Sequence, residues 1–150
     1  MNEQQIPKFQ WGSLSYLASR VGRLGTLKLT AMMESEALTR NHFMIVSALQ
    51  EFAPMSQNDL SLRTDLNRGH LVAYLDELAQ HGIVERSVDP GDRRRNIITL
   101  TEAGEKFTAK AMAAARDSEM ELFGVLNAAQ REQLRELLQL VVAQEDDSAQ

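Results

Sequence analysis

The chain has 150 residues, with 16 lysines and arginines against 21 aspartates and glutamates, and a formal net charge of −5. It has no cysteine, which excludes disulfides, thiolate metal sites and a thiol redox switch. No stretch approaches the roughly 20 apolar residues of a membrane-spanning helix, and the N-terminus lacks a secretory signal pattern. We therefore expect one soluble cytoplasmic domain over residues 1–150, without a membrane partner.

Helical spacing of apolar residues dominates the first half of the chain. A first helix is predicted over about 13–33, and its apolar stripe consists of Leu14, Leu17, Val21 and Leu24. Thr39 is a suitable N-cap for a second helix, which Pro54 ends. Ser56 and Asp59 have the spacing of a capping box and predict a short third helix.

A fourth helix is predicted from near Leu66 to Gly82, after which the pattern changes to period two. Runs 83–88 and 96–101 are rich in β-branched residues, and the seven residues that separate them begin with strong loop formers. These features predict an antiparallel hairpin.

Two further helices are predicted after the hairpin. Thr101 caps a long fifth helix that reaches about residue 125, and Asn127 with Gln130 begins a sixth. The acidic segment 144–150 is expected to form a flexible tail. The fold class is thus mostly α with a small β-hairpin (α+β), containing six helices.

Two short helices followed by a hairpin tipped with three arginines form the plan of a winged helix-turn-helix. The second of these helices presents its N-terminal end to the major groove of double-stranded DNA, where base edges differ. Arg68 is the leading candidate for a guanine contact. The candidate contacts on this helix and in the turn before it are Arg63, Asn67, Arg68, Gly69, His70 and Ala73.

The hairpin tip carries Arg93, Arg94 and Arg95, which are expected to reach the minor groove or nearby phosphates. Asp89 and Asp92 are expected to pair with an arginine and fix the shape of the loop. A turn rich in arginine is often merely solvated, so the DNA interpretation depends on the two helices that precede it.

Other classes of function find less support in the sequence. Nucleophile, zinc-protease and nucleotide-binding glycine motifs are absent, and the adjacent Asp76 and Glu77 face different directions on a helix, so catalysis is rejected. His42, His70 and His81 fall on different predicted elements, so neither a metal nor another cofactor is expected. A winged-helix dimer that binds protein rather than DNA remains the alternative, favoured by the acidic net charge.

The run GIVERSVDPGDRRRNIITLTEAG, residues 82–104, resembles the wing signature of the MarR family of bacterial transcription regulators. That signature reads G-[LIV]-[LIV]-x-R, then D-x-x-D-R-R, then L-T-x-x-G. Segment 38–49 is similar to the family's second helix, and 55–78 occupies its helix-turn-helix. Arg86 falls on a motif position, and we assign it to shaping the wing. Two departures are the run 67–73, commonly rich in Ser and Thr, and Arg95, where a small residue is usual.

The resemblance covers residues 13–143 and implies a homodimer joined through helices at about 13–33 and 102–143, with a DNA-binding core at about 39–101. It also implies a pseudo-palindromic operator and a repressor that a small, often aromatic and anionic ligand releases from DNA. The cleft for such a ligand is expected to include Trp11, Tyr16, Met33, His42 and Met44, with Met32, Phe43 and Phe107 nearby. Core packing is the alternative for each of these residues.

Overall fold

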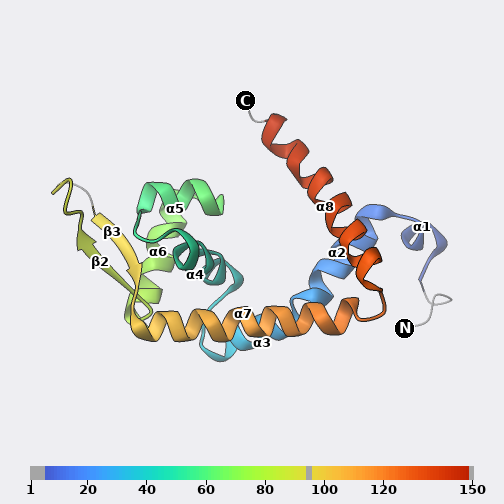
Figure 1. The fold of residues 1–150 in the computed structure, drawn as a ribbon, viewed down its shortest axis with the longest axis horizontal. Coiled ribbons are helices and arrows are strands. Elements are labelled where there is room, and N and C mark those ends of the chain that lie inside the picture. The colour runs from blue at the N-terminus through green and yellow to red at the C-terminus, as the bar shows by residue number, and fades with distance from the viewer. Residues whose placement is uncertain (1–5, 94–95, 149–150) are drawn as a thin grey trace. The chain divides into compact units, whose positions relative to one another are not determined.

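The computed structural model describes residues 6–93 and 96–148, which form eight helices and a three-stranded sheet (Figure 1). In chain order the elements are α1 (Lys8–Trp11), α2 (Leu14–Gly25), α3 (Leu27–Ser35), α4 (Arg40–Phe52), β1 (Met55–Ser56), α5 (Gln57–Thr64), α6 (Arg68–Gln80), β2 (Val84–Val88), β3 (Asn96–Leu100), α7 (Glu102–Phe123) and α8 (Ala128–Ser148). The chain divides into two compact units, one of residues 1–25 and 118–150, the other of residues 26–117.

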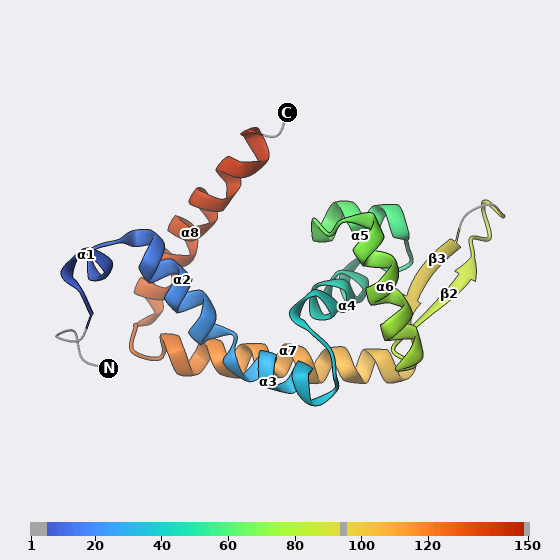
Figure 2. The same ribbon diagram turned by 180° about the vertical axis from the view of Figure 1, so that it is seen from behind.

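The unit of residues 26–117 contains the helix-turn-helix and the hairpin, and Figure 2 shows α4, α5 and α6 grouped beside the two long strands. Strands β2 and β3 pair antiparallel, with Val84 opposite Leu100 and Val88 opposite Asn96. The two-residue strand β1 pairs with the other edge of β3. This third strand was not predicted, because two residues are too few to show a period.

One apolar core holds this unit together. Leu71, Leu75 and Leu78, the positions predicted to face inward on α6, are fully buried. They belong to a cluster that also contains Leu29, Met33, Leu38, Ile45, Val46, Leu49, Met55, Leu60, Ile83, Val84, Ile98 and Ala111. Burial of a leucine side chain contributes about 1.5–3 kcal/mol, so this cluster is the main term that fixes α6 in the unit.

The other unit, of residues 1–25 and 118–150, has little core of its own. Among its described residues, Ile6 and Ser118 are the buried ones. Its exposed large apolar side chains are Phe9, Trp11, Leu14, Met120, Val125, Leu137, Leu138, Leu140, Val141 and Val142. An apolar surface of this extent is uncommon on a monomeric protein.

The helix count corrects the expected six. The predicted helix over 13–33 divides into α2 and α3 at Thr26, whose backbone is not helical, and the short α1 precedes them. Apolar periodicity continues through this break, so spacing alone did not reveal it. The helix α8 also continues to Ser148, into the segment 144–150 that was predicted to form a tail. The assignment of these helices to a dimer contact stays a prediction.

The local signals at other helix ends are confirmed. Thr101 accepts a hydrogen bond from the Gly104 amide at the start of α7, 2.9 Å long. Asn127 and Gln130 exchange reciprocal bonds of 3.0 Å before α8. Gly82 has a φ of +67° after α6, the left-handed conformation that favours glycine.

The start of α7 approaches the backbone of Ile83 so closely that it requires glycine at position 104. A Cβ added to Gly104 would lie 1.9 Å from the carbonyl oxygen of Ile83. We expect Gly104→Ala to lower the free energy of unfolding by about 1–3 kcal/mol, because the backbone must shift. Urea unfolding monitored by circular dichroism measures this loss.

Gly22→Ala is the matched control, since a Cβ there meets no atom within 4 Å. Alanine is the better helix former, so this variant should be about 0.5–1 kcal/mol more stable than the wild type. Equal effects of the two substitutions would contradict the close approach.

Candidate nucleic-acid interface

The first helix of the pair, α5, begins with a complete capping box. The Ser56 hydroxyl accepts a hydrogen bond from the Asp59 amide at 3.1 Å, and the Asp59 carboxylate accepts from the Ser56 amide at 3.3 Å. The Ser56 hydroxyl also donates to that carboxylate at 2.6 Å. Since these bonds satisfy amides that the helix leaves unpaired, the sequence sets the start of α5 locally.

A three-residue turn joins α5 to α6, a length typical of helix-turn-helix motifs. Asp65 takes the left-handed conformation with a φ of 53° and ends α5. The side chain of Asn67 accepts a hydrogen bond of 2.8 Å from the Gly69 amide and caps α6. The helix therefore begins at Arg68, two residues after the predicted start, and the Asn67 side-chain oxygen is already engaged.

The exposed N-terminal face of α6 carries the predicted contacts. Arg68, Gly69, His70 and Ala73 are all exposed. The guanidinium of Arg68 donates a hydrogen bond to the side-chain oxygen of Asn58 on α5. Sequence reasoning missed Asn58, because a contact across ten residues leaves no local pattern. The bond restricts the orientations of the leading candidate side chain.

Arg63 is also exposed, and its guanidinium packs against an aromatic ring. Its guanidinium carbon lies 3.8 Å from the centroid of the Phe52 ring, a cation–π contact between the ends of α5 and α4. The structure thus places Arg63 beside the turn, as predicted, and additionally against α4.

The wing is joined to α6 by an ion pair. The guanidinium of Arg86 on β2 lies 2.6 Å from the carboxylate of Asp76 on α6. Arg86 was assigned to shaping the wing, and the structure adds that its partner is the candidate DNA-reading helix rather than the loop.

The loop of the wing begins with a local turn. The Asp89 carboxylate accepts a hydrogen bond of 2.8 Å from the Gly91 amide. The backbone carbonyl oxygen of Asp89 accepts a second bond of 3.3 Å from the Asp92 amide. Arg93 is exposed. Arg94 and Arg95 lie outside the described residues. Asp89 therefore shapes the loop through backbone hydrogen bonds, and the pairing of Asp89 and Asp92 with an arginine stays a prediction.

The adjacent carboxylates of α6 face different partners, as their helix positions predict. Asp76 pairs with Arg86, whereas the Glu77 carboxylate lies 2.8 Å from Nε2 of the buried His42 on α4. Their separate partners rule them out as an acid–base pair.

The residues predicted to line a ligand cleft are divided between the two units, so the shared cleft stays a prediction. Met33 and His42 are closed in the core of the 26–117 unit, because both lie on inward faces of their helices. Trp11 and Tyr16 belong to the other unit, where the Tyr16 hydroxyl accepts a bond of 3.5 Å from Arg20. Met44 lines a cavity beside α4 and α5.

This cavity, which we term the α4–α5 cavity, has a volume of about 440 Å³. Its lining residues are Met44, Ser47, Ala48, Glu51, Phe52, Arg63, Thr64 and Met112. The volume lies in the range of small-molecule sites, and the lining combines apolar and aromatic groups with one cation and one anion. Sequence reasoning named Met44 and missed the rest of the lining as a ligand site.

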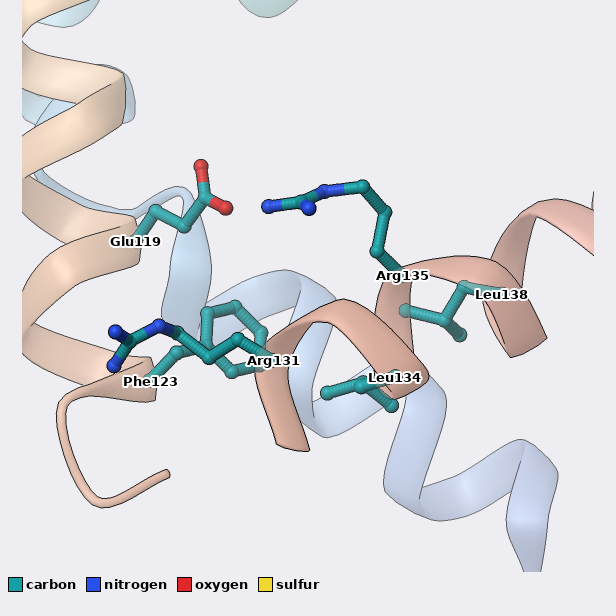
Figure 3. A pocket seen from close by; sticks show the side chains of 6 residues that line it. All are labelled: Glu119, Phe123, Arg131, Leu134, Arg135 and Leu138. Carbon is teal, nitrogen blue, oxygen red and sulfur yellow. The ribbon is translucent and has the colours of Figure 1, made fainter. Parts of the chain in front are cut away.

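A smaller hollow of about 110 Å³ lies between α7 and α8 in the unit of residues 1–25 and 118–150 (Figure 3). Arg131 and Arg135 stand at its edge, across from Glu119 on α7. Among the described residues, no three histidine, aspartate or glutamate side chains lie close enough together to hold a metal ion. Within the same residues no helix is long and apolar enough to cross a membrane.

Comparisons with known proteins agree with this architecture. The model of the MarR family matches residues 38–95. The HTH-type transcriptional repressor NicR of Pseudomonas putida is 29% identical over 123 residues, which cover 79% of this chain and 78% of NicR.

Two solved structures share the fold. CouR from Rhodococcus jostii, bound to p-coumaroyl-CoA, matches with a TM-score of 0.76 and 24% identity over 90% of this chain and 95% of CouR. A mutant of MarR from E. coli, complexed with operator DNA, matches with a TM-score of 0.74 and 24% identity over 91% of this chain and 99% of that MarR chain.

Two capped helices joined by a three-residue turn, with a hairpin fixed to the second helix, define a winged helix-turn-helix protein. Residues 38–95 match the model of the MarR family, and over most of its length the chain is similar to a transcriptional repressor, NicR.

The ion pair between α6 and the wing can be measured by a double-mutant cycle of Asp76→Asn and Arg86→Met. Both side chains are partly exposed, so we expect a coupling free energy of only about 0.5–1 kcal/mol in urea unfolding. Lys106→Met with Glu102→Gln, the exposed pair at the start of α7, is the control cycle, where at most about 0.5 kcal/mol is expected. No coupling in the first cycle would mean that the ion pair does not hold the wing.

Proposed function

We propose that the protein is a homodimeric repressor of transcription that binds a pseudo-palindromic operator in double-stranded DNA and has no catalytic activity. The observation that carries this proposal is the exposed N-terminal face of α6, set beside a wing that the Arg86–Asp76 ion pair ties to the same helix. A regulator of this kind acts where the chromosome is, so we place it in the cytoplasm.

The exposed face of α6 suits the major groove. Gly69 and Ala73 have little or no side chain, so the helix backbone can approach base edges closely. Arg68 supplies the bidentate donor that guanine accepts, and its bond to Asn58 reduces the entropy lost when it orders on DNA. His70 and Arg63 are proposed as further base or phosphate contacts.

The wing adds the second contact in this proposal. Arg93 is exposed, and Arg94 and Arg95 follow it in the sequence. Arginines on a hairpin beside the recognition helix can enter the narrow, electronegative minor groove or neutralise phosphates. Arg86 and Asp89 act indirectly, since they set the position and shape of the loop.

Dimer formation is proposed through the helices predicted for it. The exposed apolar side chains of α2 and α8, among them Leu14, Leu137 and Val141, offer the surface that a second copy would bury. A two-fold dimer presents two copies of α6 to half-sites about 10–10.5 base pairs apart. The alternative, a dimer that binds protein instead, draws support from the net charge of −5.

Fluorescence anisotropy with labelled DNA from upstream of the protein's own gene tests the DNA-binding proposal. An Arg93→Ala/Arg94→Ala double variant should bind all sequences more weakly and reduce the slope of log affinity against log salt by about 1–2, since each lost phosphate contact accounts for about 0.9. Arg68→Ala should instead cost about 1–3 kcal/mol and relax preference at one base position.

Arg116→Ala is the control in this series, because Arg116 is an exposed arginine of α7 away from the wing. It should leave the salt slope unchanged. If the wild type binds none of several promoter fragments at low salt, the protein-binding alternative takes the place of this proposal. Uniform weakening by Arg68→Ala would make Arg68 a phosphate contact.

We also propose that a small aromatic anion is the effector and that it binds the α4–α5 cavity. Phe52 and Met44 offer apolar surface for a ring, and Arg63 offers a cation for a carboxylate, whereas Glu51 disfavours a second negative charge. Since Arg63 lies at the end of the first helix of the pair, a ligand bound to it would also compete for a group proposed to contact DNA.

Salicylate, an aromatic monocarboxylate, serves as the probe of this cavity. It should raise the melting temperature of the wild type in a dose-dependent way and weaken DNA binding in the anisotropy assay. Arg63→Met should abolish the thermal shift, and Arg63→Lys should retain part of it. Equal shifts for wild type and Arg63→Met would place the anion outside the α4–α5 cavity.

A further inference from the structure

His42 is a titratable side chain in the core that the proposed DNA contacts do not use. It lies in the first turn of α4 and is fully buried. Its ring touches two elements. Nδ1 lies 2.9 Å from both the amide nitrogen and the hydroxyl oxygen of Thr39, the N-cap of α4, and Nε2 faces Glu77 on α6.

The contact with Thr39 determines where the ring carries its proton. A backbone N–H can only donate, so Nδ1 of His42 must accept and must be unprotonated. The neutral ring therefore carries its proton on Nε2, which faces the Glu77 carboxylate at 2.8 Å. Nε2 of His42 makes no hydrogen bond with this carboxylate, so the carboxylate acts on the ring mainly through charge.

A second contact joins the same turn of α4 to the same side of α6. The ring of His42 meets the ring of Tyr74 edge-on, with centroids 4.9 Å apart and an interplanar angle of 77°. The Tyr74 hydroxyl accepts a hydrogen bond of 2.7 Å from the Asn41 side chain. Tyr74 and Glu77 are three residues apart on α6 and therefore lie on one face of it.

We infer that His42 is a positioning residue for α6, and that a proton on its ring loosens the attachment of this helix to α4. Only the expected change in DNA affinity rests on the proposed function; the role of His42 in positioning α6 does not. A proton on Nδ1 would place two hydrogen-bond donors, the ring N–H and the Thr39 amide, against each other. The Thr39 hydroxyl oxygen would then be the remaining acceptor for the ring N–H. The end of α6 proposed to read DNA lies about two turns before Glu77.

The surroundings of the ring set the direction of the pH effect. Burial lowers the pKa of His42 below its ordinary value of 6.5, and the neighbouring His81 adds to this lowering, whereas Glu77 and the bond to Thr39 oppose it. The ring is therefore neutral at pH 7. When α6 is detached, the ring becomes more accessible to water and its pKa rises toward the ordinary value.

Protons consequently bind the detached form more strongly, so acid weakens the attachment. Stability from the neutral ring is present above pH 6.5 and is lost as the pH falls from there toward the lower pKa of the folded state. Each unit by which the folded pKa lies below 6.5 corresponds to a tenfold loss in the attachment equilibrium.

The test follows the ring and the helix separately in the full-length protein. Nitrogen-15 NMR of the imidazole rings gives the tautomer and titration midpoint of His42, and amide hydrogen exchange gives the protection of α6 between pH 5 and 7.5. Glu77→Gln is the main variant, since it removes a surface carboxylate and should leave the fold intact. Glu34→Gln, an exposed carboxylate of α3, is the control.

We expect the Nε2–H tautomer at pH 7, a midpoint below 6.5, and a loss of α6 protection over the same pH range. Glu77→Gln should move the midpoint lower, because the charge that favours the protonated ring is gone, and Glu34→Gln should not move it. An Nδ1–H tautomer, an unmoved midpoint in Glu77→Gln, or protection that is insensitive to the proton would each overturn the inference.

His42→Gln and His42→Asn add the functional arm. Neither side chain titrates, so relative to the wild type both should lose the acid-dependent weakening of DNA affinity between pH 7 and pH 5.5. A wild type that weakens no more than His42→Gln does would count against the inference. If no variant binds DNA at any pH, the proposed function fails, while the ring and exchange data still decide the role of His42.

Discussion

The attachment of α6 is the constraint on which the rest of the DNA-binding unit depends. Leu71, Leu75 and Leu78 bury one face of this helix in the core. Two adjacent carboxylates on its flanks then reach in different directions, Asp76 to Arg86 on the wing and Glu77 to His42 on α4. Apolar burial provides most of the stability, and the polar contacts select one orientation around the helix axis.

This arrangement explains how the proposed readers of DNA keep their geometry. Arg86 joins β2 of the wing to α6, and Arg68 is hydrogen-bonded to Asn58 on α5. Each link is weak, since exposed or half-exposed polar pairs contribute about 1 kcal/mol or less. A set of weak links on a rigid core permits release, which a regulator needs as much as binding. The α4–α5 cavity is lined by residues of α4 and α5, and His42 contacts α6 through Glu77, so both lie on helices of this set.

The other unit presents a different physical problem. Its described part exposes large apolar side chains, most of them on α8, and buries few of its own. A dimer resolves this problem at no cost to the DNA-binding unit, which already has a complete core.

The sequence by itself determined the features that depend on neighbours two to four residues apart. The capping pairs Ser56–Asp59 and Asn127–Gln130, the leucine face of α6 and the two long strands were all predictable, because local hydrogen bonds and apolar period create them. Together with the wing motif they were enough to indicate the family. They were not enough to detect the break at Thr26, where the apolar period continues through a non-helical residue.

Only the tertiary structure decided which polar groups meet. Arg86 and Asp76, Arg68 and Asn58, and His42 and Glu77 are far apart in sequence, and packing of the core brings each pair together. The same packing placed Met33 and His42 inside the core, left Met44 on a cavity, and set Arg63 over Phe52. Local pattern specifies the face of a helix, but the partner of that face follows from how the helices pack.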